Sequence, residues 1–261
     1  MTSMSDQSRA TAAADVIWKA WTSGERISEL PADVRPRSTA EGMAAQLELG
    51  RHAGSTYGWK IAATTTAGQA HIGVDGPLPG PLFERFRHSP GDVLPSDDLH
   101  MRVVEAEFAY RMGADVAPDA ELDELLAAVD GLHLAVEVPD SRFTRFETVG
   151  AAQLMADCAC AGRFVLGPDI PGWRELDLST QGTSVWINGA EAAKGSGGNV
   201  LGDPRTALAW IAAELPRYGH QLRAGDIVTT GTTTVPVPIG PGDAVRADFG
   251  ALGEVAFRFA D

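Results

Sequence analysis

The chain has 261 residues and a formal net charge of −14, with 21% charged residues and 44% from the hydrophobic AVILMFWYC set. This length and balance fit a folded globular protein with one large domain, or a domain with a small appendage. The acidic balance argues against nucleic-acid binding, because phosphate would be repelled and no Lys/Arg stripe offsets it. There is no unbroken apolar run of about 18 residues and no apolar core behind a basic segment near the start. We therefore expect neither a membrane span nor a secretory signal.

Two helices are expected at the N-terminal end of the chain. The first is indicated by apolar residues at three- and four-residue spacing, which are Ala13, Val16, Ile17, Ala20 and Trp21. It should end at Gly24, and the capping-box spacing of Ser38 and Glu41 predicts the start of the second helix. We therefore predict a helical N-terminal cap over residues 1–56 and a β-rich catalytic domain over residues 57–261.

From Tyr57 onward, strand patterns outnumber helix patterns. The expected strands are 57–63, 103–110, 132–138, 163–166, 183–187, 226–230, 244–249 and 254–259. Asn188-Gly189 is a hairpin turn signal, and helices are expected from Asp119 to Val129 and after the cap Asp203. Because helices and strands do not alternate strictly, the pattern predicts an α+β domain built around a sheet or roll.

The run Val104-Glu105-Ala106-Glu107-Phe108 carries the first chemical signal. Residues two apart share one face of a strand, so Glu105 and Glu107 should project together. Their charges repel each other unless a cation lies between them, and hard cations such as Mg²⁺ prefer oxygen ligands. A solvated strand face is the alternative.

Glu137 adds a third acid at the end of an apolar strand. Burying it without a partner would cost several kcal/mol. Three glutamates on two strands predict an open carboxylate site, which water and a chelating substrate would complete.

Lys60 is a lone cation inside the apolar strand pattern Gly58-Trp59-Lys60-Ile61. It is either a snorkelling residue at a sheet edge or a partly desolvated base with a lowered pKa. The motif alone does not decide between the two.

Motifs along nearly the whole chain resemble the 2-keto-4-pentenoate hydratase family of the fumarylacetoacetate hydrolase-like superfamily. They include Gly58–Ile61, Val104–Glu107, Glu137 with Asp140–Arg142, Gly162–Gly167, Leu201–Pro204 and Ala224–Val228. The resemblance implies a β-rich roll or barrel behind a small helical part, an active-site lysine at Lys60, and Mg²⁺ or Mn²⁺ bound by Glu105, Glu107 and Glu137. It also implies homo-oligomers.

The activity expected from this resemblance is hydration of a 2-keto- or 2-hydroxy-dienoate to a 4-hydroxy-2-keto acid. Thr230, Gly231 and Thr232 lie where the family has a Thr-Gly-Ser-like turn. Their backbone N–H groups could hold the substrate carboxylate, although a polar turn is the alternative. Association with a pathway decarboxylase or aldolase is a further expectation.

Several positions depart from the family pattern. Leu78 stands where typical hydratases have an Asp that works with the lysine, and Asp75, three residues earlier, is the candidate substitute. The family's Asp-Asn-Ala-Ser-Ser-like stretch is Asp157-Cys158-Ala159-Cys160-Ala161 here, which removes the serine hydroxyls.

These departures keep other functions open. The loss of the Asp favours a 4-oxalocrotonate-type decarboxylase, whereas the Glu-Ala-Glu run favours the hydratase. A C–C hydrolase and a non-catalytic partner subunit are further alternatives. Cys158 and Cys160, the two cysteines of the chain, are expected to be buried inert thiols without a disulfide, which points to the cytoplasm.

Overall fold

The computed structural model describes residues 5–261. Residues 1–4, which belong to the segment in which no secretory signal is expected, lie outside the described residues. Seven α-helices are present in the described chain. They are α1 (Asp6–Ser23), α2 (Thr39–Glu48), α3 (Gly50–Ala53), α4 (Thr66–Ile72), α5 (Leu122–Ala127), α6 (Ala151–Ala156) and α7 (Pro204–Glu214). Within residues 5–261, no helix has the length and apolarity needed to cross a membrane.

The helix ends follow the predicted signals. Gly24 ends α1 in the left-handed conformation with φ 72°, and the Ser38 side chain accepts a hydrogen bond from the Glu41 amide at the start of α2. The capping box is only half formed, because the Glu41 carboxylate accepts from the Arg37 amide instead of the Ser38 amide. Asp203 caps α7 as expected.

The larger sheet has eight strands. Seven run in the order β2 (Leu78–Phe83), β1 (Thr56–Ala62), β10 (Ile227–Thr229), β5 (Val103–Met112), β6 (Val129–Val138), β7 (Arg163–Asp169) and β3 (Arg87–His88), and β11 (Val237–Pro238) pairs with β5. Its two edge strands, β2 and β3, are separated by only three residues, which can span at most about 14 Å. The sheet must therefore curl until its edges approach each other, which gives it an inner and an outer face.

The smaller sheet packs against the outer face of the larger sheet. Its five strands run in the order β4 (Val93–Leu94), β13 (Glu254–Phe259), β12 (Ala244–Asp248), β8 (Gly182–Ile187) and β9 (Ala190–Ser196). The β8–β9 hairpin turns at Asn188-Gly189, as predicted. Phe108 on the outer face of β5 meets Phe249 beside β12, with ring centroids 5.3 Å apart, so the main core lies between the sheets.

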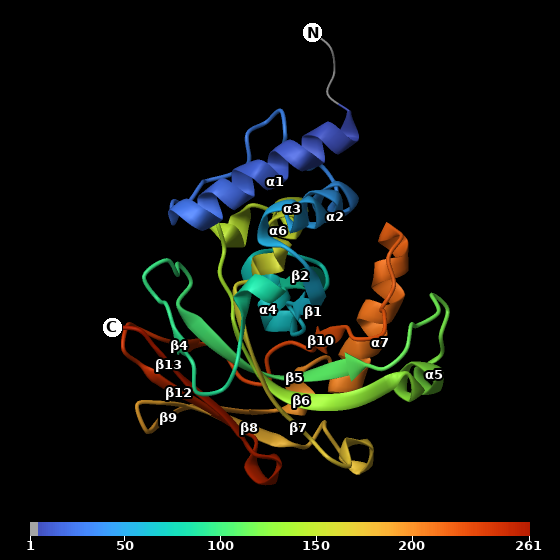
Figure 1. The fold of residues 1–261 in the computed structure, drawn as a ribbon, viewed down its shortest axis with the longest axis vertical. Coiled ribbons are helices and arrows are strands. Elements are labelled where there is room, and N and C mark those ends of the chain that lie inside the picture. The colour runs from blue at the N-terminus through green and yellow to red at the C-terminus, as the bar shows by residue number, and fades with distance from the viewer. Residues whose placement is uncertain (1–4) are drawn as a thin grey trace.

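The N-terminal helices do not form a layer by themselves. Figure 1 shows α1, α2 and α3 together with α6 at one end of the molecule, above β1 and β2. Helix α6 lies about a hundred residues downstream of α2, yet it packs against α2 and α1. The division at residues 56 and 57 stays a prediction, because the helical layer also draws on the second part.

The junction between α5 and β6 was predicted wrongly. The helix expected up to Val129 ends at Ala127, and β6 begins at Val129 instead of Leu132. Gly131 and Asp130 therefore belong to the strand, where Arg111 of β5 pairs with Gly131.

Candidate metal and active site

Strand register brings the acidic residues together on the inner face of the larger sheet. In the antiparallel β5–β6 pair, Glu105 lies opposite Glu137, and Glu107 lies opposite Ala135. One carboxylate oxygen from each of the three glutamates can be chosen so that all three atoms lie within 4.8 Å of one another. Directly opposed residues on one face of an antiparallel pair are close neighbours, so the cluster follows from the register.

The inner face around these acids is mostly apolar. Strand pairing places Leu82, Ala135 and Phe164 on it, within a separate buried cluster that also holds Tyr57, Ala109 and Ile227. The site thus lies inside the curled sheet and not on a solvated strand face. Glu107 and Glu137 are 0% and 1% exposed, whereas Glu105 keeps partial access to solvent.

Glu107 is held by the last residue of β10 and by the turn that follows this strand. Its Oε2 atom accepts hydrogen bonds from the Thr229 hydroxyl and, at 2.9 Å, from the Gly231 amide. Gly231 has φ 95°, and a Cβ there would lie 2.2 Å from the Thr64 hydroxyl oxygen, so only glycine permits this approach. The other oxygen, Oε1 of Glu107, has no hydrogen-bond partner among residues 5–261.

Lys60 reaches the same site from β1. Its Nζ atom donates to the Ala159 carbonyl at 2.9 Å and lies 3.1 Å from Oε1 of Glu137, in an ion pair without hydrogen-bond geometry. The side chain is 3% exposed, so Lys60 does not snorkel to solvent.

The electrostatics of the cluster favour a cation. Burial is the largest influence and raises the pKa of all three glutamates. Repulsion between the carboxylates adds to this effect for Glu105 and Glu107, and the pKa of Glu105 is raised to about 7. For Lys60 burial alone would lower the pKa, but the attraction of Glu137 and Glu105 outweighs it and the pKa is raised. The lowered pKa considered for Lys60 is therefore not what this arrangement produces.

A divalent ion fits the residues present. One ammonium leaves two of the three carboxylate charges unbalanced, and a divalent cation would neutralise them. Buried charges are normally paired or bound to a metal, and Oε1 of Glu107 is buried without a partner among the described residues. Oxygen-only donors suit hard cations. The acidic cluster can bind a metal ion.

The remaining predicted site residues lie around this centre in different ways. The Thr230 hydroxyl and amide both donate to the Phe108 carbonyl, and the Thr232 hydroxyl donates to the Thr234 carbonyl. These donors, like the Gly231 amide that binds Glu107, already have partners within the protein, and a role of residues 230–232 in substrate binding stays a prediction.

Asp75 lies apart from these groups. It is exposed between α4 and β2, without an ion pair or hydrogen bond to Lys60. Leu78, by contrast, is 6% exposed and pairs with Ala62, two residues from Lys60 on the same face of β1. The catalytic role of Asp75 stays a prediction, and the structure offers no contact that would support it.

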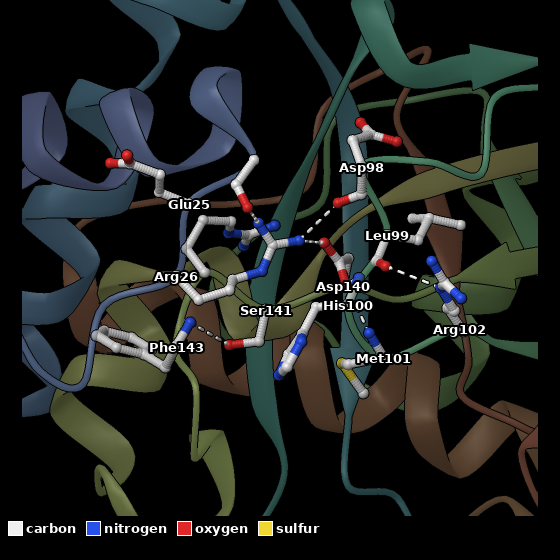
Figure 2. Close-up of polar contacts among 12 residues, drawn as sticks. Glu25, Arg26, Asp98, Leu99, His100, Met101, Arg102, Asp140, Ser141 and Phe143 are labelled. Atoms are coloured by element: carbon white, nitrogen blue, oxygen red, sulfur yellow. Dashed lines mark hydrogen bonds and ion pairs between the residues drawn. The ribbon is translucent and has the colours of Figure 1, made fainter.

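Asp140 was part of a recognised motif, but its contacts were not foreseen. Its carboxylate accepts from the His100 and Met101 amides, at 2.8 and 2.9 Å, and from Arg26 Nη2 at 2.6 Å. Figure 2 shows that the Arg26 guanidinium contacts both the Asp140 carboxylate and the Asp98 carbonyl. One carboxylate therefore joins the end of β6, the loop entering β5 and the segment after α1.

Comparison with known proteins adds independent findings. The model of the fumarylacetoacetate (FAA) hydrolase C-terminal family matches residues 67–260. The chain is 31% identical over 255 residues to a 2-keto-4-pentenoate hydratase of Paraburkholderia xenovorans (strain LB400), covering 95% of this chain and 93% of that protein. It is 33% identical over 203 residues to a 4-oxalocrotonate decarboxylase of Pseudomonas sp. (strain CF600), covering 77% and 76% of the two chains.

A solved structure is also similar over nearly its full length. The 4-oxalocrotonate decarboxylase from Pseudomonas putida G7, complexed with magnesium and adipate, has a TM-score of 0.88 and 30% identity, with 96% of this chain and 97% of that chain covered. The same decarboxylase has also been solved with calcium and acetate.

Proposed function

Because the chain belongs to the 2-keto-4-pentenoate hydratase family of the fumarylacetoacetate hydrolase-like superfamily, we propose that it is a divalent-metal-dependent hydratase. Its proposed substrate is a 2-hydroxy-2,4-dienoate or the corresponding keto form, and its product a 4-hydroxy-2-keto acid. The observation that carries this proposal is the convergence of Glu105, Glu107 and Glu137 beside the buried Lys60 ammonium.

The three glutamates are the proposed ligands of Mg²⁺ or Mn²⁺. An ion held there would act as a Lewis acid toward the carboxylate and C2 oxygens of a keto acid. Thr229 and the Gly231 amide fix one oxygen of Glu107, which leaves its other oxygen for the ion. The position of these donors supports Glu107 as an oriented ligand.

Lys60 is the proposed proton carrier. Formation of the keto form moves a proton to the far carbon of the dienoate, and water then adds at the β-carbon of the unsaturated ketone. Both steps need a group that holds and moves a proton inside a site from which bulk water is largely excluded. Lys60 is buried and its ammonium is fixed by two oxygen partners, which supports this role. Thr230, Gly231 and Thr232 are the proposed carboxylate-binding turn.

The test is turnover of a 2-hydroxy-dienoate, measured as loss of its ultraviolet absorbance. Glu107→Gln, assayed with excess Mg²⁺, and Lys60→Met should each lower kcat by about 100-fold or more. Lys194→Met is the matched control, because Lys194 is 73% exposed on β9 and should leave turnover unchanged. Wild-type rates in Glu107→Gln would refute the proposed role of the acidic cluster.

Decarboxylation of a 4-oxalocrotonate-type keto diacid is the second candidate. The similarity to the decarboxylase structure and the buried Leu78 both favour it. CO₂ release from a keto diacid, compared with dienoate hydration under the same conditions, separates the two activities. The hydratase proposal requires the hydration rate to be the larger.

Assembly and location complete the proposal. We propose a cytoplasmic homo-oligomer, to be checked by light scattering of the purified protein. Association with a pathway decarboxylase or aldolase is testable by co-purification with the candidate enzyme.

A further inference from the structure

Residues Cys158, Ala159 and Cys160 form a left-handed turn beside the proposed active site. Their φ values are 54°, 49° and 62°, and none of them is glycine. Side chains of L-residues are sterically disfavoured in this region, so non-glycine residues rarely occupy it in succession. Such conformations persist only where the surroundings hold them, and they occur frequently at functional sites.

The surrounding contacts fix this turn from several directions. The buried Arg142 guanidinium donates to the carbonyls of Asp157 and Ala161, which flank the turn, and to the Asp157 carboxylate. The Asp140 amide donates to the Cys160 carbonyl at 2.9 Å. Arg142 and Asp140 thus hold the two ends and the last carbonyl of the turn.

The middle carbonyl points to the lysine. The Ala159 carbonyl accepts from Lys60 Nζ at 2.9 Å, and the same ammonium lies 3.1 Å from Glu137. On the other side, the Cys158 carbonyl packs against Gly80, where a Cβ would lie only 2.1 Å from its oxygen. The turn is therefore fitted closely between Gly80 and the Asp140–Arg142 run.

We propose that the left-handed turn Cys158–Cys160 is a positioning element. Its Ala159 carbonyl accepts a hydrogen bond from the Lys60 ammonium and so places that ammonium for proton transfer. A backbone carbonyl in an ordinary conformation at this point would aim elsewhere. The inference rests on the proposed role of Lys60, and it assigns no chemical step to the two thiols. Burial raises the pKa of the Cys160 thiol to about 12, which agrees with inert cysteines.

Gly80→Ala is the principal test. Gly80 has an ordinary φ, so alanine is acceptable to its own backbone, and the added Cβ must displace the Cys158 carbonyl. The same Cβ would lie 3.3 Å from Cδ of Lys60, a tight contact that a shift of a few tenths of an ångström relieves. We expect kcat to fall by about 10- to 100-fold. KM and the Mg²⁺ dissociation constant should stay within about threefold of wild type, because the glutamates lie on other strands. A crystal structure of the variant should show the Ala159 oxygen displaced from Lys60 Nζ.

One variant serves as the control. Gly76→Ala adds a Cβ in open space in the loop before β2, and it should match wild type in all three constants. A loss of kcat in Gly76→Ala as large as that in Gly80→Ala would show that the loss does not come from the Cys158–Cys160 turn.

The outcomes separate this inference from the proposed function. If wild type hydrates dienoates and Gly80→Ala does so equally fast, the positioning role is wrong and the function stands. If wild type is inactive, the function fails, and the Lys60–Ala159 separation in the variant crystal still decides the structural claim. If Gly80→Ala does not fold, Arg142→Lys replaces it: this variant keeps the buried charge but cannot bind both flanking carbonyls, and the same loss of kcat at constant Mg²⁺ affinity is required.

Discussion

At the scale of single residues, Glu107 depends on its neighbours for orientation. Thr229 donates to the same oxygen that the Gly231 amide binds, and these donors lie at the end of β10 and just after it. Thr229→Val removes the hydroxyl at nearly constant shape, so one lone pair of a buried carboxylate loses its partner. We expect Mg²⁺ or Mn²⁺ affinity to fall by about tenfold or more, measured by isothermal titration calorimetry.

Thr230→Val is the matched control for this prediction. The Thr230 hydroxyl is equally buried, but it donates to the Phe108 carbonyl and not to an acid. Metal affinity should therefore stay at the wild-type value, whereas KM should rise if the turn binds the substrate carboxylate. Equal losses of metal affinity in the two variants would mean that general loosening of the turn is responsible.

Some of these site residues could be predicted from the sequence, and others could not. Glu105, Glu107 and Lys60 could be recognised because a charged side chain in an apolar strand needs a physical reason. The Ala159 carbonyl could not be recognised, since every residue has a carbonyl and its direction depends on backbone angles. The contact between Thr229 and Glu107 depends on two strands far apart in the chain, which no local pattern reports.

At the scale of elements, a buried ion pair attaches the segment after α1 to the catalytic sheet. Arg26 and Asp140 have side chains only 9% and 6% exposed and lie 2.6 Å apart. Arg26→Met would leave the Asp140 carboxylate buried without its cation, although the His100 and Met101 amides would still bind it. We expect a loss of about 3 kcal/mol in the free energy of unfolding, measured by urea denaturation.

An exposed ion pair provides the comparison. The Arg51 side chain is 47% exposed and pairs with Asp15 and Glu48, which are 53% and 21% exposed, so Arg51→Met should change the free energy of unfolding by less than about 1 kcal/mol. If the two variants unfolded at the same urea concentration, the Arg26 pair would contribute no more than a surface pair. The segment after α1 would then be held mainly by apolar contacts.

Elements with strong local signals were predicted, and those that depend on pairing were not. The long strands β5 and β6 show alternation of apolar residues, whereas β2 contains Pro79 and Pro81, which cannot donate to a sheet. β2 is tolerated because it is an edge strand that pairs with β1 alone. The polar strand β9 was missed for a related reason: it too lies at an edge, and most of its side chains are exposed.

At the scale of the whole molecule, the acidic cluster links pH, metal and stability. The pKa values of Glu105, Glu107 and Glu137 are raised in the folded protein above the ordinary 4.5, to about 7 for Glu105. The folded state therefore binds more protons than the unfolded state over this interval. Stability is then highest near or below pH 4.5 with respect to these groups, and it falls as pH rises toward about 7.

The metal-free protein should therefore unfold at a lower temperature at about pH 8 than at about pH 5.5. Saturating Mg²⁺ should reverse this loss, because an ion that binds only the folded state stabilises it and neutralises the ionised carboxylates. Thermal unfolding of EDTA-treated protein, with and without Mg²⁺ at both pH values, measures the effect. The expected rise in Tm on adding Mg²⁺ is larger at pH 8, where more of the carboxylates are ionised.

The variant Glu105→Gln distinguishes the effect of the acidic cluster on stability from the effect of the net negative charge of the chain. The net charge of −14 also disfavours the compact state as pH rises, and this contribution is almost the same in the variant. Removing one buried repulsion should make metal-free Glu105→Gln more stable than metal-free wild type at pH 8, while Mg²⁺ should stabilise the variant much less. A metal-free wild type that became more stable between pH 5.5 and 8, or a variant stabilised by Mg²⁺ as strongly as wild type, would contradict the link. A divalent cation at the cluster would balance the acidic charge of the interior, and the stability of the folded molecule would then depend on that cation.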